Sequence, residues 1–349
     1  MDQEAYGKYT KAEILSQPEI WEQVVNSWPP SMLETFPKTE DYDQVLFIGC
    51  GSTFFLSRWA ARMHEAHSGS ISRAVPSSDL LLHPRHWIQA GQNTLLIASS
   101  RSASTTETIK AIDSFKADHT GDVIVITCNQ QEPMGSQTEF VISAEQAQEE
   151  SIAQTRSFSS MLLAHAFYTT GSLPINIGKD LRAAGERLFR ESLPLAEQIA
   201  QDTTLQRFFF LGSGPLYGLA NECMLKMKEI SQSYAESFHN MEFRHGPMSM
   251  VDEHTLVIGF IGDHGAEQDL AVLADMKAKG ARTLAIANQV PEKPAGLDHV
   301  IRLDSPLPMI WRSVLYLSPM QWLAFNRGLV NGLNPDRPHN LDAVVVLDE

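Results

Sequence analysis

Two groups of polar residues, one in each half of the chain, have types and spacings suited to chemistry. The first is the hydroxyl-rich run at residues 100–108 (SRSASTTET), which follows a short apolar segment. The second is the trio Glu222, Lys226 and Glu229, with His245 a little further along. We expect the first group to hold an anion and the second to move protons.

The run at 100–108 is expected where a strand leads into a helix. Free backbone N–H groups and the positive end of the helix dipole attract anions there. The hydroxyls of Ser100, Ser102 and Thr105 can surround a phosphate, and Arg101 can add a charge-assisted contact. A Ser or Thr before Glu is also an ordinary helix cap, so a solvated loop remains the alternative.

Nucleotide motifs are not found near these residues. The run has no Gly-Lys-Ser or Gly-Lys-Thr, so it is not a P-loop. Gly49-Cys50-Gly51 lacks the third glycine of the dinucleotide fingerprint, because Phe54 stands at that position.

Glu222, Lys226 and Glu229 lie at positions i, i+4 and i+7 of a predicted helix. At about 100° per residue they fall within roughly 60° of one another on one face. Apolar neighbours favour partial burial of this face; they are Met224, Leu225, Met227 and Ile230. A carboxylate partly buried beside an ammonium group is a candidate general base. A surface stripe with one Glu–Lys pair is the alternative.

His245 precedes Gly246-Pro247, and a turn at that point can present a ring nitrogen to a cleft. The chain has 12 histidines, so this one does not establish a site by itself. There is no HExxH or similar spacing, and therefore we expect no metal site.

The elements that must position these residues are repeated along the chain. Three segments of the first half recur in the same order in the second, 163, 161 and 159 positions later. The pairs are 47–51 (FIGCG) with 210–214 (FLGSG), 94–97 (TLLI) with 255–258 (TLVI), and 128–130 (CNQ) with 287–289 (ANQ). A duplicated α/β unit explains these matches.

Apolar strands alternate with helical segments, which predicts two tandem α/β domains with doubly wound, flavodoxin-like parallel sheets. Strands are expected at 45–48, 94–98, 123–127, 139–143, 208–211, 255–260, 283–287 and 299–303. Helices are expected at 11–27, 55–66, 107–116, 152–169, 179–200 and 311–327. The predicted divisions are an N-terminal helical segment at 1–30, domains at 31–178 and 195–335, and a tail at 336–349.

Composition limits the class of partner and compartment. The 349 residues are 43% hydrophobic, enough for two cores. A formal net charge of −15 argues against nucleic acid and anionic membranes as partners, but permits one small anion in a local pocket. Cys50, Cys128 and Cys223 are far apart, which predicts free thiols and no structural zinc. Without a signal peptide or membrane-length apolar run, we expect a soluble cytoplasmic protein.

Taken together, these residues resemble the tandem SIS (sugar isomerase) domain family. The chain is similar to the isomerase half of glucosamine-6-phosphate synthase and to stand-alone aminosugar-phosphate deaminases and isomerases. The resemblance rests on residues 13–18 (EILSQP), 100–105 (SRSAST), 153–158 (AQTRSF), 211–247 and 335–341 (PDRPHNL).

The resemblance implies a sugar phosphate as the substrate and assigns residues to it. The implied substrate-binding and phosphate-binding residues are Thr53, Ser100, Arg101, Ser102, Thr105 and Gln154. Glu229 matches the base that moves a proton between C1 and C2, with Glu222 and Lys226 beside it. His245 matches the residue that assists ring opening, usually from a neighbouring subunit, which implies a homodimer with the active site at the interface. No metal or organic cofactor is implied.

Departures from the synthases favour the catabolic branch. A separate glutaminase domain with an N-terminal cysteine is not expected, because the first cysteine is Cys50, and Asn340-Leu341 is followed by Asp342-Ala343 where the synthases have Ala-Lys. Arg101 and Ala103 replace the usual Gln and Gly. The leading hypothesis is a glucosamine-6-phosphate deaminase that releases fructose 6-phosphate and ammonia. The alternatives are an isomerase or deaminase of a galactosamine or tagatose phosphate, a fructosamine-6-phosphate deglycase, and a non-catalytic sugar-phosphate sensor.

Overall fold

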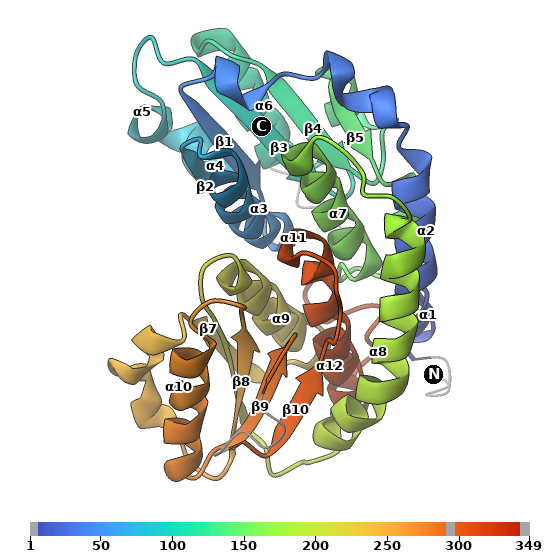
Figure 1. Cartoon of the computed structure of the whole chain (residues 1–349), viewed down its shortest axis with the longest axis vertical. Helices are drawn as coiled ribbons and strands as arrows, with labels where there is room; N and C mark the ends of the chain where they lie inside the picture. The colour runs from blue at the N-terminus through green and yellow to red at the C-terminus, as the bar shows by residue number, and fades with distance from the viewer. Residues whose placement is uncertain (1–5, 291–296, 343–349) are drawn as a thin grey trace. The chain divides into compact units, whose positions relative to one another are not determined.

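The computed structural model describes residues 6–290 and 297–342, and within it the chain forms two compact units, each built around one parallel sheet (Figure 1). The first unit contains residues 19–149 and 156–180. The second contains residues 6–18, 150–155 and 181–341, apart from the undescribed stretch. Neither unit is a continuous stretch of sequence.

The first sheet has five parallel strands in the order β2-β1-β3-β4-β5. They are β1 (Gln44–Gly49), β2 (Ser72–Pro76), β3 (Thr94–Ser100), β4 (Val123–Thr127) and β5 (Val141–Ser143). Helices cover both faces, as a parallel sheet requires. Phe47 lies against His64 and His165, with ring centroids 5.5 and 5.7 Å away. Its neighbours Leu46 and Ile48 belong to the apolar cluster on the opposite face.

The helices of the first unit form two groups, each packed on one face of this sheet. His64 and His165 belong to α3 (Ser52–Ser68) and α7 (Arg156–Thr170), which pack together, whereas α4 (Ser77–Leu82) packs with α6 (Thr106–Asp118). The remaining elements are α2 (Gln17–Ser27), α5 (Pro84–Trp87) and the short 3-10 helices η2 (Pro30–Thr35), η3 (Thr39–Asp41), η4 (Pro133–Ser136) and η5 (Glu145–Ala147). Helix α8 (Ile177–Ala200) begins in this unit and ends in the second.

The second sheet repeats the strand order of the first, because β10-β9-β8-β6-β7 is the same arrangement counted from β6. Its strands are β6 (Arg207–Gly212), β7 (Tyr234–Phe238), β8 (Thr255–Ile261), β9 (Arg282–Ala287) and β10 (His299–Arg302). Phe209 and Leu211 pack with Met276 of α10 (Ala266–Ala278), and Phe208, which points the other way, lies under Arg327 of α12 (Ser318–Val330). The fold class expected from the sequence is confirmed.

Further helices complete the second unit. Helix α9 (Leu216–Ser231) packs against α12, and so does α1 (Lys8–Leu15). The shorter elements are α11 (Met309–Arg312), η6 (Met241–Arg244), η7 (Pro247–Met250) and η8 (Ser313–Tyr316).

All eight predicted strands are present, but the sequence reading missed β2 and β7. Both are strands at a sheet edge, and their sequences SRAVP and YAESF mix polar and apolar residues. An edge strand buries less of its surface than a central one, so it lacks the continuous apolar run by which the central strands were recognised.

Prolines explain two wrong helix predictions. The single helix expected at 11–27 is divided into α1 and α2, because Pro18 has no N–H to donate to the carbonyl of Ile14. The side-chain amide of Gln17 donates to that carbonyl instead, at 3.1 Å. The helix expected at 311–327 is likewise divided into α11, η8 and α12, with Pro319 in the first turn of α12.

The helix expected at 152–169 begins only at Arg156, because residues 150–155 are held in an irregular segment. The carboxylate of Glu13 accepts the N–H groups of Glu150 at 2.7 Å and Ser151 at 3.2 Å. The N–H of Ile152, the first residue of the expected helix, donates to the carbonyl of Asp336 at 3.3 Å, so the backbone of this segment bonds to partners outside a helix.

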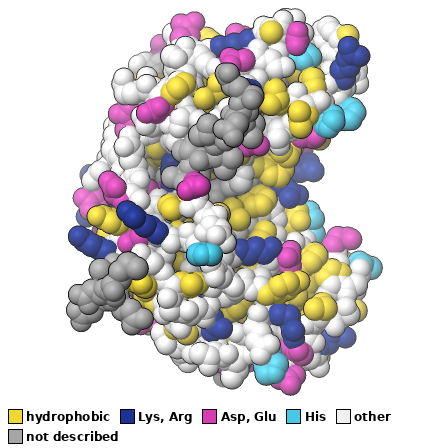
Figure 2. Space-filling model, turned by 180° about the vertical axis from the view of Figure 1, so that it is seen from behind, with side chains coloured by type: hydrophobic (Ala, Val, Ile, Leu, Met, Phe, Trp, Pro, Cys, Tyr) yellow, Lys and Arg dark blue, Asp and Glu magenta, His cyan; other side chains and the backbone are white. Residues whose placement is uncertain are grey.

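The three cysteines are free, and charges of both signs lie on the surface. On the face shown in Figure 2, acidic and basic side chains are interspersed. Cys50, Cys128 and Cys223 are free thiols, and burial raises the pKa of Cys223 well above its usual value. Within residues 6–290 and 297–342, no helix has the length and apolar character of a membrane span.

His64 and His165 predict how the first unit responds to acid. Burial lowers the pKa of His64 to about 4 and that of His165 to about 3, so both are neutral in the folded chain. The unfolded chain takes up these protons near pH 6.5, and hence the free energy of unfolding falls as the pH drops from about 6.5 towards 4. For His64 alone the loss is up to about 3 kcal/mol.

Urea unfolding at several pH values measures this effect. We expect His64→Gln to flatten the loss of stability between pH 6.5 and 4, and the exposed His86→Gln in the same unit to leave it unchanged. An equally steep loss in both variants would contradict the prediction.

Candidate active site

The loop between β3 and α6, residues 100–105, gathers the predicted hydroxyls into one tight turn. The hydroxyl oxygen of Ser100 accepts the N–H of Ala103 at 3.1 Å and lies 3.1 Å from the hydroxyl oxygen of Thr105. Ser102 accepts the N–H of Ser104 at 3.2 Å. Thr105 is the residue before the first turn of α6, so the hydroxyls lie at the positive end of that helix.

The backbone of this loop is fixed to its surroundings at two points. The carbonyl of Arg101 accepts the N–H of Cys128 at 3.2 Å, and the carbonyl of Ala103 accepts the N–H of Met134 at 3.0 Å. Ala103 is buried and has a φ of 54°, the left-handed region that costs a residue with a Cβ. The loop is thus held in one strained conformation.

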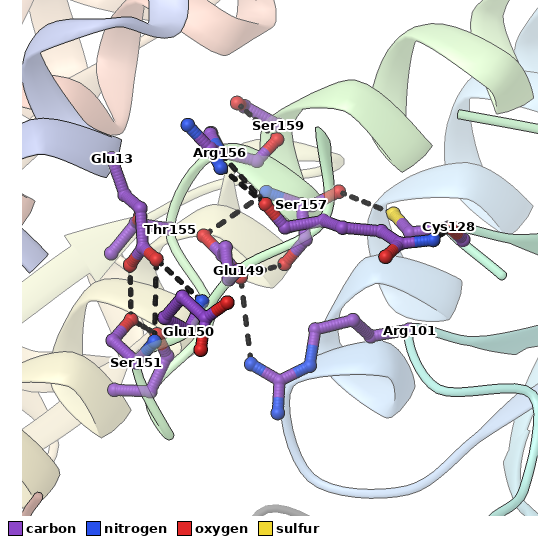
Figure 3. A network of polar contacts seen from close by, with 12 residues as sticks. Glu13, Arg101, Cys128, Glu149, Glu150, Ser151, Thr155, Arg156, Ser157 and Ser159 are labelled. Atoms are coloured by element: carbon purple, nitrogen blue, oxygen red, sulfur yellow. Dashed lines mark hydrogen bonds and ion pairs between the residues drawn. The ribbon is translucent and has the colours of Figure 1, made fainter. Parts of the chain in front are cut away.

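The side chain of Arg101 is fixed as well. One guanidinium nitrogen lies 3.5 Å from a carboxylate oxygen of Glu149, and Figure 3 shows the guanidinium directed toward that carboxylate. Glu149 was not among the residues singled out from the sequence. The one sequence signal for Glu149 is its position in the acidic pair Glu149-Glu150, ahead of a predicted helix.

Two of the expected binding residues lie outside this hydroxyl cluster. The hydroxyl of Thr53 donates to the carbonyl of Cys50 and accepts the N–H of the same residue, each at 2.9 Å, so it closes the turn after β1. Gln154 belongs to the second unit, where its side-chain oxygen is buried and has no hydrogen-bond partner among the described residues.

The predicted trio lies on α9, in the second unit, with Lys226 between two carboxylates. Its ammonium nitrogen is 3.3 Å from a carboxylate oxygen of Glu222 and also forms an ion pair with Glu229. The side chains of Glu222 and Lys226 are 0% and 1% exposed, and that of Glu229 is 18% exposed. The alternative of a solvated surface stripe is therefore wrong for Glu222 and Lys226.

The electrostatics of the trio keep Lys226 charged. Burial alone would lower the pKa of Lys226, but attraction to Glu222 and Glu229 outweighs it and raises the pKa above its usual value of 10.5. The positive charge of Lys226 is therefore lost only as the pH rises above 10.5. Glu229 is the member of the trio that solvent can reach.

His245 lies on a well-anchored segment with its side chain exposed. The preceding Phe243 is buried against Phe209 and Phe238, with ring centroids 5.0 and 5.4 Å away. Arg244 donates to Asp275 at 2.7 Å. These contacts fix the backbone on one side of His245, and the ring faces outward.

Residues 7–10 and 334–336, near the two ends of the described chain, contact one another and have a structural role. The carboxylate of Asp336 accepts both the N–H and the hydroxyl of Thr10, each at 2.8 Å, at the start of α1. The side-chain oxygen of Asn334 accepts the N–H of Gly7 at 3.1 Å. Ala343, which replaces a synthase lysine, lies outside the described residues.

Equivalent positions of the two sheets hold different polar groups. After β1 and β2, Cys50 and Ser77 contact Thr108 of α6, with Ser77 at 3.0 Å. The counterparts after β6 and β7 are Ser213 and Asn240, and Ser213 donates to Asp269 of α10 at 3.1 Å. Burial raises the pKa of Asp269 to about 6 despite that hydrogen bond. The second copy therefore has a carboxylate where the first has a hydroxyl.

No group of three or more His, Cys, Asp or Glu side chains in the described part of the chain is arranged to hold a metal ion. The side chains at the two candidate groups can supply acid–base catalysis and hydrogen bonding.

Comparison with known proteins gives consistent matches along the chain. The SIS domain model matches residues 40–170 and 205–314. The glutamine–fructose-6-phosphate aminotransferase of Chlamydia caviae is 26% identical over 99% of this chain and 60% of that protein, so the chain spans about three fifths of its length. The putative D-galactosamine-6-phosphate deaminase AgaS of Escherichia coli K12 is 26% identical over 96% of this chain and 92% of that protein.

Solved structures match over almost the whole chain. The tagatose-6-phosphate ketose/aldose isomerase of Escherichia coli has a TM-score of 0.86 at 24% identity and covers 96% of each chain. The glucosamine-6-phosphate deaminase of Thermotoga maritima has a TM-score of 0.79 at 25% identity, over 97% of this chain and 99% of that one. These matches confirm the predicted family resemblance and the predicted class, an SIS-type enzyme.

Lys226 provides a test of the buried charges. Replacing it by methionine leaves Glu222 buried without its cation, and we expect the free energy of unfolding to fall by roughly 3–5 kcal/mol. Adding Glu222→Gln removes that buried charge and is expected to recover part of the loss. Urea unfolding measures both.

Lys228→Met is the matched control, because Lys228 lies on the same helix and pairs with Glu236 at the surface. We expect a change of less than about 1 kcal/mol. Equal losses of unfolding free energy for Lys226→Met and Lys228→Met would contradict the prediction that burial makes the Lys226 charge essential to stability.

Proposed function

The chain belongs to the SIS domain family, and from this premise we propose that it deaminates an aminosugar phosphate, with glucosamine 6-phosphate as the leading substrate. The single observation that supports this most directly is the trio on α9. A buried Glu222–Lys226 pair beside the partly exposed Glu229 is an arrangement suited to moving a proton on a bound substrate.

In this proposal the 100–105 loop binds the phosphate group. The hydroxyls of Ser100, Ser102 and Thr105 and the N-terminus of α6 supply donors, and Arg101 supplies positive charge. Phosphate binding provides interaction energy at a distance from the reacting carbons, which holds the sugar in place for proton transfer.

Glu229 acts as the base. It removes the proton from C2 of the open-chain aminoaldose and returns it at C1. The amine at C2 loses one proton and the oxygen at C1 gains one, so the aldehyde becomes an alcohol and the amine becomes an imine. Water then adds to the imine carbon and ammonia leaves, so one glucosamine 6-phosphate and one water give one fructose 6-phosphate and one ammonia. Lys226 holds Glu229 in position through their ion pair. The sequence of steps requires no metal or organic cofactor.

His245 is proposed to assist ring opening from a neighbouring subunit, which makes the active unit a homodimer. Its exposed ring on an anchored backbone supports a role outside its own subunit. The relatives named above supply the second candidate, because one is called a D-galactosamine-6-phosphate deaminase and another a tagatose-6-phosphate isomerase. Galactosamine 6-phosphate is therefore the alternative substrate.

An ammonia-release assay tests the reaction. Glucosamine 6-phosphate, galactosamine 6-phosphate and a fructosamine 6-phosphate are compared, and glucosamine 6-phosphate is expected to release ammonia fastest. Glu229→Gln should lower the turnover about 10²–10⁴-fold, the usual contribution of a general base. Lys228→Met is the control on the same helix. Ammonia release that survives Glu229→Gln would exclude the proposed base, and none from any substrate would exclude a deaminase.

The dimer is tested by mixing two inactive variants. Glu229→Gln and His245→Gln chains are unfolded together and refolded, so that mixed dimers form. If His245 acts across the interface, each mixed dimer has one site with both native residues, and roughly a quarter of the wild-type activity returns. Separately refolded variants are the control. Mixed samples as inactive as the separate ones would exclude a shared site.

A further inference from the structure

We propose that Glu149 is a positioning residue that holds the Arg101 guanidinium in place for the phosphate group of the substrate. This inference rests on the proposed role of the 100–105 loop, and it adds a residue that no motif in the sequence indicated. Both residues belong to the first unit.

Three contacts define the place of Glu149 (Figure 3). One carboxylate oxygen accepts the N–H of Ser157 at 3.2 Å, and the other accepts the hydroxyl of the same residue. The second oxygen also lies 3.5 Å from the guanidinium of Arg101. The side chain of Glu149 is 0% exposed and that of Arg101 is 11% exposed.

Burial explains why the carboxylate of Glu149 needs both hydrogen-bond donors and a positive charge near it. A carboxylate removed from water must be matched by donors and positive charge. Ser157 is the second residue of α7, so the carboxylate meets the positive end of that helix. The two contacts between Glu149 and Ser157 serve the first turn of α7 without any need for Arg101. The approach of Arg101, from a different loop, means that the same carboxylate also fixes the guanidinium of the proposed phosphate site.

The orientation of Arg101 is what Glu149 contributes. An arginine side chain is long and has many rotamers, and a guanidinium held in advance loses less entropy when it binds a phosphate. The backbone of Arg101 is already fixed through its carbonyl, which accepts the N–H of Cys128 at 3.2 Å and the hydroxyl of Thr127 at 3.3 Å. Glu149 therefore fixes the one part of Arg101 that the loop itself leaves movable.

The two effects of Glu149 have opposite signs, which makes the proposal testable. Its negative charge weakens the pull of Arg101 on any anion, whereas its hold on the guanidinium favours a correctly placed phosphate. If positioning dominates, loss of the carboxylate weakens binding. If charge neutralisation dominates, the same change strengthens it.

The experiment measures inorganic phosphate and glucosamine 6-phosphate binding by calorimetry, together with kcat and KM. Glu149→Gln is expected to raise Kd and KM about tenfold with kcat within twofold of wild type. The same substitution in an Arg101→Gln background should have no further effect, because its effect acts through Arg101. Glu149→Asp, which keeps the charge but shortens the side chain, should raise Kd in the same direction.

Ser157→Ala is the matched control. It removes the hydroxyl contact with Glu149 and leaves Arg101 in place, so we expect lower thermal stability and a phosphate Kd within twofold of wild type. A merely structural Glu149 would make Ser157→Ala and Glu149→Gln alike in both measurements, and this result would overturn the proposal.

Failure of the inference is distinguishable from failure of the proposed site. Weaker binding in Arg101→Gln with unchanged or tighter binding in Glu149→Gln would overturn the role of Glu149 and leave the phosphate loop standing. Phosphate binding that Arg101→Gln does not alter would overturn the proposed role of Arg101 in the phosphate site and the inference together.

Discussion

Charge removed from water needs a partner within a few ångströms, and this chain meets that requirement by joining residues that are far apart in sequence. Glu13 accepts backbone N–H groups from residues 150–151, and Asp336 accepts two donors from Thr10. Glu149 joins Ser157 and Arg101. Each buried carboxylate thus fixes a segment that neither a sheet nor a helix holds. The irregular parts of the fold depend on these contacts as the strands depend on apolar burial.

The buried ammonium of Lys226 applies the same constraint to chemistry. Two carboxylates around one cation give the trio itself a net negative charge, and the more exposed of the two, Glu229, is the one that a substrate can reach. The protein interior holds this carboxylate by a fixed cation instead of by mobile water. Such preorganisation lowers the reorganisation that accompanies proton transfer. At the hydroxyl loop of the first unit a helix N-terminus and neutral donors favour an anion, and the largely buried pair of Arg101 and Glu149 adds fixed charge beside them.

Much of the fold and of the candidate site could be predicted from the sequence, for physical reasons that differ from element to element. Central strands such as Val123–Thr127 were recognised because burial on both faces demands an unbroken apolar run. The i, i+4, i+7 spacing placed Glu222, Lys226 and Glu229 on one face because helix geometry depends only on local sequence. The edge strands β2 and β7 were missed because they are only partly buried, so their sequences mix polar and apolar residues. Glu149 and Glu13 were missed because a carboxylate's partner is chosen by the tertiary fold, which no local pattern encodes.

The contacts of Thr10 with Asp336 have a consequence for how the second unit can be produced in isolation. Residues 7–10 and 334–336 lie side by side, although more than three hundred residues separate them. A gene fragment that begins at α8 would omit α1 and residues 150–155, and it would leave the carboxylate of Asp336 without the donors of Thr10. Circular permutation suits this unit better than truncation, because a short linker joining these neighbouring segments would preserve α1 in its place.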